Sequence, residues 1–331
     1  MGTVNRYEFE RKIPITAGLM DDPIKHWVRL NAWLPVATER FKKCNRKIRY
    51  FTLTTEALYD VKTLIEAGLL ERSERGYPGL GFCEMYDYTY EGIMRKIRWC
   101  GWSYKGTFEE MVDKHPRLAD EFNFDVVNLD FFGVPFPQSE APLEGTWGAI
   151  KRMIQVQKSH GTSFDMFITL KCRKAETDEQ ALKEIASLIK SNLDIGRGKS
   201  EFESRVGHLD IIRLLAEDYR TFLCVGVPKL IIGEAVDVGY ALSYFESYCY
   251  PRVDVVGNYH IVKFVFSLEV PQQQKRVFAQ PPSIVASYDE AVPMIFDKEV
   301  VNVSSVFEKN ARLVFELQRD LDRLKTIEIG N

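Results

Sequence analysis

Short apolar runs alternate with helix-like segments along the first half of this chain, and this alternation most limits the folds open to it. The runs have the length of strands and are apolar at nearly every position, which is typical of strands covered by helices on both faces. Strand-like runs lie at 48–54, 80–85, 102–112, 124–133 and 164–172, with helix-like segments at 58–70, 89–100 and 147–161 between them. The pattern predicts an α/β fold with a doubly wound, mostly parallel sheet.

The segments on either side of this stretch predict further elements. A helix is expected over 23–43, where Asp22 is placed to cap it and Pro35 to kink or divide it. Residues 176–221 are charged and strongly helical, so we interpret them as a helical insertion or cap on the sheet. The apolar run 222–228 then returns the chain to the core.

The last third of the chain predicts a hairpin and a helical tail. A helix is expected over 229–239, before two strand-like runs at 241–251 and 259–270 that a turn separates. Such a pair predicts an antiparallel hairpin at the end of the sheet. The chain is expected to finish with an amphipathic helix over Val303–Lys325.

These elements divide the chain into three parts. We expect an N-terminal helical segment at 1–44, an α/β domain at 45–270 with the insertion at about 176–221, and a C-terminal extension at 271–331 that ends in a helix.

Composition excludes several classes of protein. A chain of 331 residues buries a core large enough to be stable without disulfides, and its six cysteines are scattered, as expected for buried thiols in a reducing compartment. Neither the cysteines nor the five histidines have metal-ligand spacing. The net charge of −3 gives no global basic field. The polar N-terminus and the lack of a long apolar stretch predict a cytoplasmic protein with no signal peptide and no membrane span.

Polar side chains follow four of the strand-like runs. In a doubly wound sheet the carboxyl ends of the strands meet at the edge where ligands bind, so these side chains are the candidate site. They are Thr54, Thr55 and Glu56 after the first run, Glu84 in the second, Thr107 in the third, and Asp130, Phe131, Phe132 and Gly133 at the end of the fourth.

Parallel strands followed by a late antiparallel hairpin resemble the class I, Rossmann-like S-adenosylmethionine (AdoMet)-dependent methyltransferases, and the resemblance covers roughly residues 45–270. That family has a seven-stranded sheet with the last strand inserted antiparallel beside the sixth. The turn Asp130-Phe131-Phe132-Gly133 is similar to the D-P-F-G motif of enzymes that methylate a base amino group. The resemblance implies a transferase in which Asp130 orients the amine and Phe132 stacks on a nucleic-acid base, with positioning supplying most of the rate.

The resemblance also implies a cofactor site, and the sequence departs from the family there. Glu84 would accept hydrogen bonds from the ribose hydroxyls of AdoMet, and Thr107 stands where the family has an acid near the adenine. The family's glycine-rich first turn is replaced by Thr54-Thr55-Glu56-Ala57, whose side chains crowd the cofactor, while the two threonines are suited to cap the next helix. Phe131 replaces the motif's proline.

These departures leave other functions open. One is a catalytically inactive subunit of the same fold that assembles with partner proteins through the helical insertion or the C-terminal helix. Another is a nucleotide-binding sensor or lyase on the same fold. The run Lys42–Arg49 carries five positive charges, which form a solvated loop or contact nucleic-acid phosphates, with Arg95, Lys96 and Arg98 extending it. His26, beside Lys25 in the first helix, is expected on a solvated face.

Overall fold

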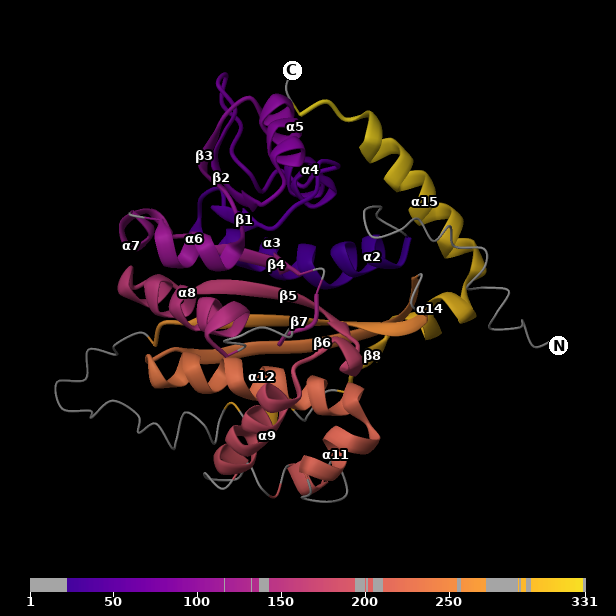
Figure 1. Cartoon of the computed structure of the whole chain (residues 1–331). Helices are drawn as coiled ribbons and strands as arrows, with labels where there is room; N and C mark the ends of the chain where they lie inside the picture. The colour runs from indigo at the N-terminus through magenta and orange to yellow at the C-terminus, as the bar shows by residue number, and fades with distance from the viewer. Residues whose placement is uncertain are drawn as a thin grey trace.

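A single mixed sheet runs through the computed structural model of the chain. The structure describes residues 23–115, 117–131, 133–136, 143–193, 200, 202–204, 211–254, 257–271, 291, 293–295 and 299–329. Within these ranges the sheet has eight strands in the order β3-β2-β1-β4-β5-β7-β6-β8 (Figure 1). The strands are β1 (Tyr50–Thr52), β2 (Tyr77–Glu84), β3 (Cys100–Lys105), β4 (Val126–Asp130), β5 (Phe164–Cys172), β6 (Ala241–Asp254), β7 (Gly257–Glu269) and β8 (Val301–Asn302).

The pairing of these strands confirms the predicted fold class. Strands β3, β2, β1, β4 and β5 pair in parallel, and β7 is inserted antiparallel between β5 and β6. The predicted hairpin is therefore β6 and β7, and the order up to β6 is that of a methyltransferase-like Rossmann fold. The sheet has one strand more than expected, because Val301 and Asn302 add a short parallel strand beside β6.

Helices cover both faces of the sheet. One face carries α2 (Pro23–Val28), a π-helical segment (Arg29–Trp33), α3 (Leu34–Cys44), α4 (Tyr59–Glu66), α5 (Asp87–Ile97), α14 (Val303–Lys309) and α15 (Ala311–Thr326). The other carries α6 (Phe108–Lys114), α7 (Leu118–Glu121), α8 (Gly148–Ser159), α9 (Glu179–Leu193), α11 (Ile211–Glu217) and α12 (Tyr219–Asp237). Each face has its own hydrophobic cluster because neighbouring strand residues point to opposite sides: Met166 and Ile168 pack in one, and Phe167 in the other.

The predicted first helix is present and is divided near Pro35, as expected. Proline has no N–H and its ring clashes with the carbonyl four residues earlier, so it kinks or interrupts most α-helices that contain it. Here the helix widens to the π form over Arg29–Trp33 before α3 begins at Leu34. Within this segment α2 contacts α14 and α15, and α3 lies over β5 (Figure 1).

Two expected elements differ from the structure. The helix expected over 229–239 begins earlier, at Tyr219, so the apolar run 222–228, which returns to the core as expected, belongs to the same helix, α12, and α12 continues through Pro228. An apolar run of this length does not distinguish a strand from a helix buried on all sides, and α12 is such a helix. The tail helix is also divided, into α14 and α15, at Asn310, whose side chain accepts a hydrogen bond from the Leu313 N–H at 3.3 Å.

Buried ion pairs fasten α3 to the sheet. The Arg40 guanidinium donates to both carboxylate oxygens of Asp165 on β5, at 2.7 and 3.2 Å, and also contacts Glu269 on β7. All six cysteines are free thiols. None of the helices in the described part of the chain combines the length and the hydropathy needed to span a membrane.

Candidate functional site

The carboxyl edge of the parallel strands gathers several of the predicted site residues. Strand β1 lies between β2 and β4, with Thr52 opposite Phe82 on one side and Asn128 on the other. The turn after β1 therefore lies between the end of β2, at Glu84, and the end of β4, at Asp130. This is the edge at which ligands bind in doubly wound folds.

A buried carboxylate organises the turn after β1. Asp60, in the first turn of α4, is 8% exposed and accepts hydrogen bonds from the hydroxyls of Tyr50, Thr52 and Thr54 at 2.8, 2.7 and 3.0 Å. The Asn128 side chain of β4 lies 3.4 Å from the same carboxylate. Burial raises the pKa of Tyr50 well above its usual value, so its hydroxyl stays a donor. Asp60 thus ties β1 and β4 to the start of α4.

The expected capping of α4 by Thr54 or Thr55 is wrong. Residue Leu58 is the N-cap, no side chain caps the helix, and the Thr54 hydroxyl is directed to Asp60 instead. Leu58 is fully buried with a φ of 54°, a conformation that favours glycine, and its N–H donates to the Thr55 carbonyl at 3.0 Å. The turn keeps a glycine-like backbone without a glycine.

Helix α5 holds the side chain of Glu56. The Glu56 carboxylate pairs with Lys96 at 3.1 Å, and a Cβ at Gly92 would lie 2.7 Å from the Glu56 carboxyl carbon. Glycine at position 92 therefore makes room for this side chain. Two side chains of this glycine-free turn, Thr54 and Glu56, are each bound to another part of the fold.

Glu84 ends β2 beside exposed apolar side chains. Its carboxylate is half-buried and accepts the Tyr86 N–H at 2.8 Å. Burial raises the pKa of Glu84, and the N–H groups of Tyr86 and Met85 offset part of this effect. Met85 and Tyr86 are 49% and 63% exposed. A carboxylate with free acceptor positions next to an exposed aromatic ring suits a nucleoside.

The side chain of Thr107 caps helix α6. Its hydroxyl accepts the Glu110 N–H at 3.1 Å, and the Glu110 carboxylate accepts the Thr107 N–H at 3.2 Å. This reciprocal capping box is a structural reason for a threonine at position 107. A role for Thr107 near an adenine stays a prediction.

Asp130, at the end of β4, lies in a row of polar and charged side chains on neighbouring strands. It pairs with Lys25 of α2 at 2.5 Å and its side chain is 13% exposed. Thr169 on β5 lies opposite Asp130, and Lys263 on β7 lies opposite Thr169. Burial raises the pKa of Asp130, but Lys25, Lys263 and Thr169 outweigh it and hold the pKa well below its usual value. The carboxylate is therefore ionised at neutral pH.

The rest of the predicted turn serves packing where it is described. Phe131 is half-buried and packs edge-to-face on Phe108 of α6, with the ring centres 5.7 Å apart. The Gly133 carbonyl accepts the Lys171 N–H at 3.0 Å. Phe132 lies outside the described residues, so its stacking on a base stays a prediction.

Sequence reasoning missed two residues that shape this site, Lys25 and Asp60, and misplaced His26. The expected solvated face for His26 is wrong: the ring is fully buried, and its Nε2 lies 2.7 Å from Asp320 of α15. No local pattern marks these contacts, because each joins elements that only the fold brings together. Across the described ranges, no three His, Cys, Asp or Glu side chains are grouped to hold a metal ion.

Replacing Asp60 by Asn is expected to lower the free energy of unfolding by about 1–2 kcal/mol, because an amide NH₂ then faces hydroxyl donors in a buried site. Urea denaturation followed by circular dichroism measures this loss. The exposed Asp113 on α6 provides the matched control, and Asp113→Asn is expected to change stability by less than about 0.5 kcal/mol. Equal stability of the two variants would contradict the role given to Asp60.

Comparisons with solved structures give weak likenesses, of which two are described here. No family model and no curated protein sequence matches the chain. A crystal structure of cofactor-bound Rv0187 from MTB is 10% identical, with a TM-score of 0.34 over 78% of this chain and 86% of that one. The O-methyltransferase TomG from Streptomyces achromogenes, involved in tomaymycin synthesis and solved with SAM, is 10% identical, with a TM-score of 0.28 over 78% of this chain and 94% of that one. The fold assignment rests on the strand order, since both TM-scores are low.

Proposed function

We propose that this protein is an AdoMet-dependent methyltransferase whose cofactor binds at the carboxyl edge between β2 and β4. The observation that carries the proposal is the placement of two carboxylates, Glu84 and Asp130, on either side of the β1 turn in a sheet of this strand order. Carboxylates at these strand ends accept hydrogen bonds from ribose hydroxyls and from an amino group.

The residues present at this edge fit the cofactor. Glu84 keeps acceptor positions beyond those that the N–H groups of Tyr86 and Met85 use, and the exposed ring of Tyr86 is available to a purine. In the glycine-free turn, Asp60 holds Thr54 and Lys96 holds Glu56. When bound, AdoMet would supply an electrophilic methyl group.

Asp130 is suited to orient the methyl acceptor, which we propose is an amino group on a nucleic-acid base. An ionised carboxylate has about four acceptor positions, so Asp130 keeps capacity for a substrate N–H beside its contact with Lys25. A hydrogen bond to that N–H turns the lone pair of the amine toward the methyl group. Positioning of this kind supplies most of the rate in such a transfer.

A second candidate function is a non-catalytic subunit of the same fold. The Lys25–Asp130 ion pair favours it, because a lysine already occupies part of the carboxylate that would face the substrate. A protein of this kind would not transfer a methyl group even where it bound AdoMet. A radiolabelled methyl-transfer assay on total RNA and DNA separates the two candidates: label in nucleic acid supports the enzyme, and cofactor binding without label supports the subunit.

Calorimetric titration with AdoMet tests the cofactor site. The wild-type protein is expected to bind, and Glu84→Gln to bind about tenfold more weakly, or about 1.4 kcal/mol, because a charged acceptor is replaced by a neutral one. Glu91→Gln on the exposed side of α5 is the matched control and should bind like the wild type. No binding at millimolar AdoMet, or equal binding by Glu84→Gln, would overturn the proposal.

A further inference from the structure

A depression lined by cations borders the turn after β1 at Ala57 and lies between α4, the end of α5 and the segment after α15. Its volume is about 530 Å³, within the range of small-ligand sites. The charged side chains that line it are Lys62, Arg95, Lys96, Arg98, Lys325 and Glu328. We call it the basic groove. Five of its lining side chains are cations and one is an acid.

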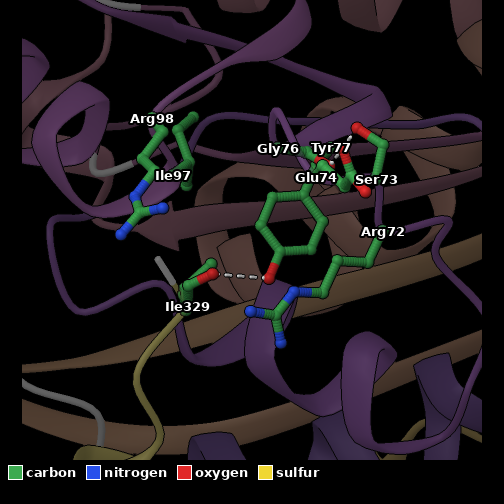
Figure 2. A pocket seen from close by; sticks show the side chains of 8 residues that line it. All are labelled: Arg72, Ser73, Glu74, Gly76, Tyr77, Ile97, Arg98 and Ile329. Atoms are coloured by element: carbon green, nitrogen blue, oxygen red, sulfur yellow. Dashed lines mark hydrogen bonds between the residues drawn. The ribbon is translucent and has the colours of Figure 1, made fainter. Parts of the chain in front are cut away.

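A second depression of about 280 Å³ adjoins the basic groove and shares Arg98 and Ile329 with it. Figure 2 shows this neighbour, which adds the guanidinium of Arg72. The Tyr77 hydroxyl donates to the Ile329 carbonyl at 2.8 Å and fixes the segment between the two depressions. The second depression is lined by two arginines, Arg72 and Arg98, and by one acid, Glu74.

Charge within the basic groove is only partly neutralised. Lys96 pairs with Glu56 at 3.1 Å and Lys325 with Asp322 at 2.6 Å. The Lys62 ammonium is largely buried and donates to the Leu324 carbonyl at 2.8 Å. Burial, and then the nearby charge of Lys96, lowers the pKa of Lys62.

Arg95 and Arg98 supply the positive charge of the basic groove that is not neutralised by an ion pair. Both are exposed, and no carboxylate of the described residues pairs with either one. By contrast, the basic run predicted to join them is neutralised elsewhere: Arg46 binds the buried Asp125 at 2.7 Å, and Lys43 binds Glu269. The end of α5 is therefore a better candidate for a phosphate contact than the run 42–49.

Backbone strain fixes Arg98 at the junction of the two depressions. Its φ of 60° and ψ of −53°, with the Trp99 N–H bonded to the Ile97 carbonyl at 2.7 Å, form a γ-turn that a side chain rarely adopts. Gly76 packs directly against this turn, since a Cβ there would lie 2.2 Å from the Trp99 carbonyl oxygen. Such strain costs about 1–3 kcal/mol and is found preferentially at functional sites.

We propose that the basic groove binds phosphate groups, with Arg95 and Arg98 as the principal contacts. Guanidinium groups bind phosphate oxygens in pairs of parallel hydrogen bonds, and an exposed, unpaired arginine provides them without first breaking an ion pair. The phosphates belong either to a polynucleotide or to a free phosphate compound. The proposal does not depend on methyl transfer, because the groove uses residues other than Glu84 and Asp130.

The test compares the wild-type protein with the double variant Arg95→Gln/Arg98→Gly. Glycine suits the positive φ at position 98, so this variant is expected to unfold at the same urea concentration or a higher one. Arg152→Gln, which removes an exposed arginine from α8 on the other face of the sheet, is the matched control. Fluorescence anisotropy with a labelled single-stranded RNA and calorimetry with tripolyphosphate are the two arms.

The double variant is expected to bind the probe at least about tenfold more weakly than the wild type. The slope of log RNA affinity against log salt concentration should become shallower by about two, one for each lost phosphate contact. Binding of RNA alone identifies a polynucleotide, and equal affinity for tripolyphosphate identifies a free phosphate compound. The double variant should bind AdoMet as the wild type does, so a failure of the phosphate proposal can be told apart from a failure of the cofactor site. Absence of binding to either probe, or equal binding by the double variant and Arg152→Gln, would overturn the proposal.

Discussion

Replacing Arg40 by Met is expected to lower the free energy of unfolding by about 3–5 kcal/mol, the largest loss among the substitutions considered, because it leaves a buried charge without its partner. Arg40 and Asp165 are 3% and 2% exposed, and two hydrogen bonds join them. Burial opposes the charge on Arg40, but the hydrogen bonds and charges of Asp165 and Glu269 hold its pKa above the ordinary value. Urea denaturation followed by circular dichroism measures the loss.

Lys43→Met provides the matched control for Arg40→Met. Lys43 pairs with Glu269, a residue that Arg40 also contacts, but its side chain is 55% exposed. Exposed ion pairs contribute about 0–1 kcal/mol, so this variant should be almost as stable as the wild type. A loss below about 1 kcal/mol for Arg40→Met would mean that α3 is held to the sheet by apolar packing alone.

Replacing Lys25 by Met is expected to cost about 2–3 kcal/mol at pH 7, because Asp130 then stays charged in a largely buried place without its nearest cation. The effect of the Lys25–Asp130 ion pair on the free energy of unfolding depends on pH. In the wild type the pKa of Asp130 is depressed, so its contribution to stability is present above the unfolded value of about 3.9 and is lost as the pH falls toward the folded value. In the variant the loss of Lys25 removes the largest of the effects that lower the pKa of Asp130, so the variant loses less stability on acidification than the wild type.

The difference in the free energy of unfolding between the wild type and Lys25→Met should therefore be larger at pH 7 than at pH 4. Urea denaturation at both pH values measures it. Lys105→Met, which removes an exposed lysine paired with Asp87, is the control and should follow the wild type at both. A difference of the same size at pH 4 and pH 7 would show that Lys25 acts through packing rather than through the charge of Asp130.

The sequence predicted the elements whose signals are local. The strand run 164–172 agrees with β5 at both ends, and Glu84 and Asp130 were placed correctly at strand ends, because apolar runs and the polar residues that end them are neighbours in the chain. The run 222–228 was harder, since a helix that is apolar all round has no helical periodicity to detect.

The contacts that define the site were beyond sequence reasoning. Asp60 reads as an ordinary acid in a first helical turn, yet it accepts hydrogen bonds from side chains of β1 and β4. Lys25 meets Asp130 because the fold brings α2 to the end of β4, 105 residues later in the sequence. His26 meets Asp320 across 294 residues of sequence. Pair contacts of this kind depend on the whole fold, so no single segment reveals them.

The central claim is that AdoMet binds at the carboxyl edge with its ribose on Glu84. A crystal structure of the protein with S-adenosylhomocysteine tests it most directly. We predict that the ribose hydroxyls lie within hydrogen-bond distance of the Glu84 carboxylate and that the sulfur lies between the turn Thr54–Ala57 and Asp130. A nucleoside bound away from Glu84, or no bound ligand at millimolar concentration, would contradict the claim.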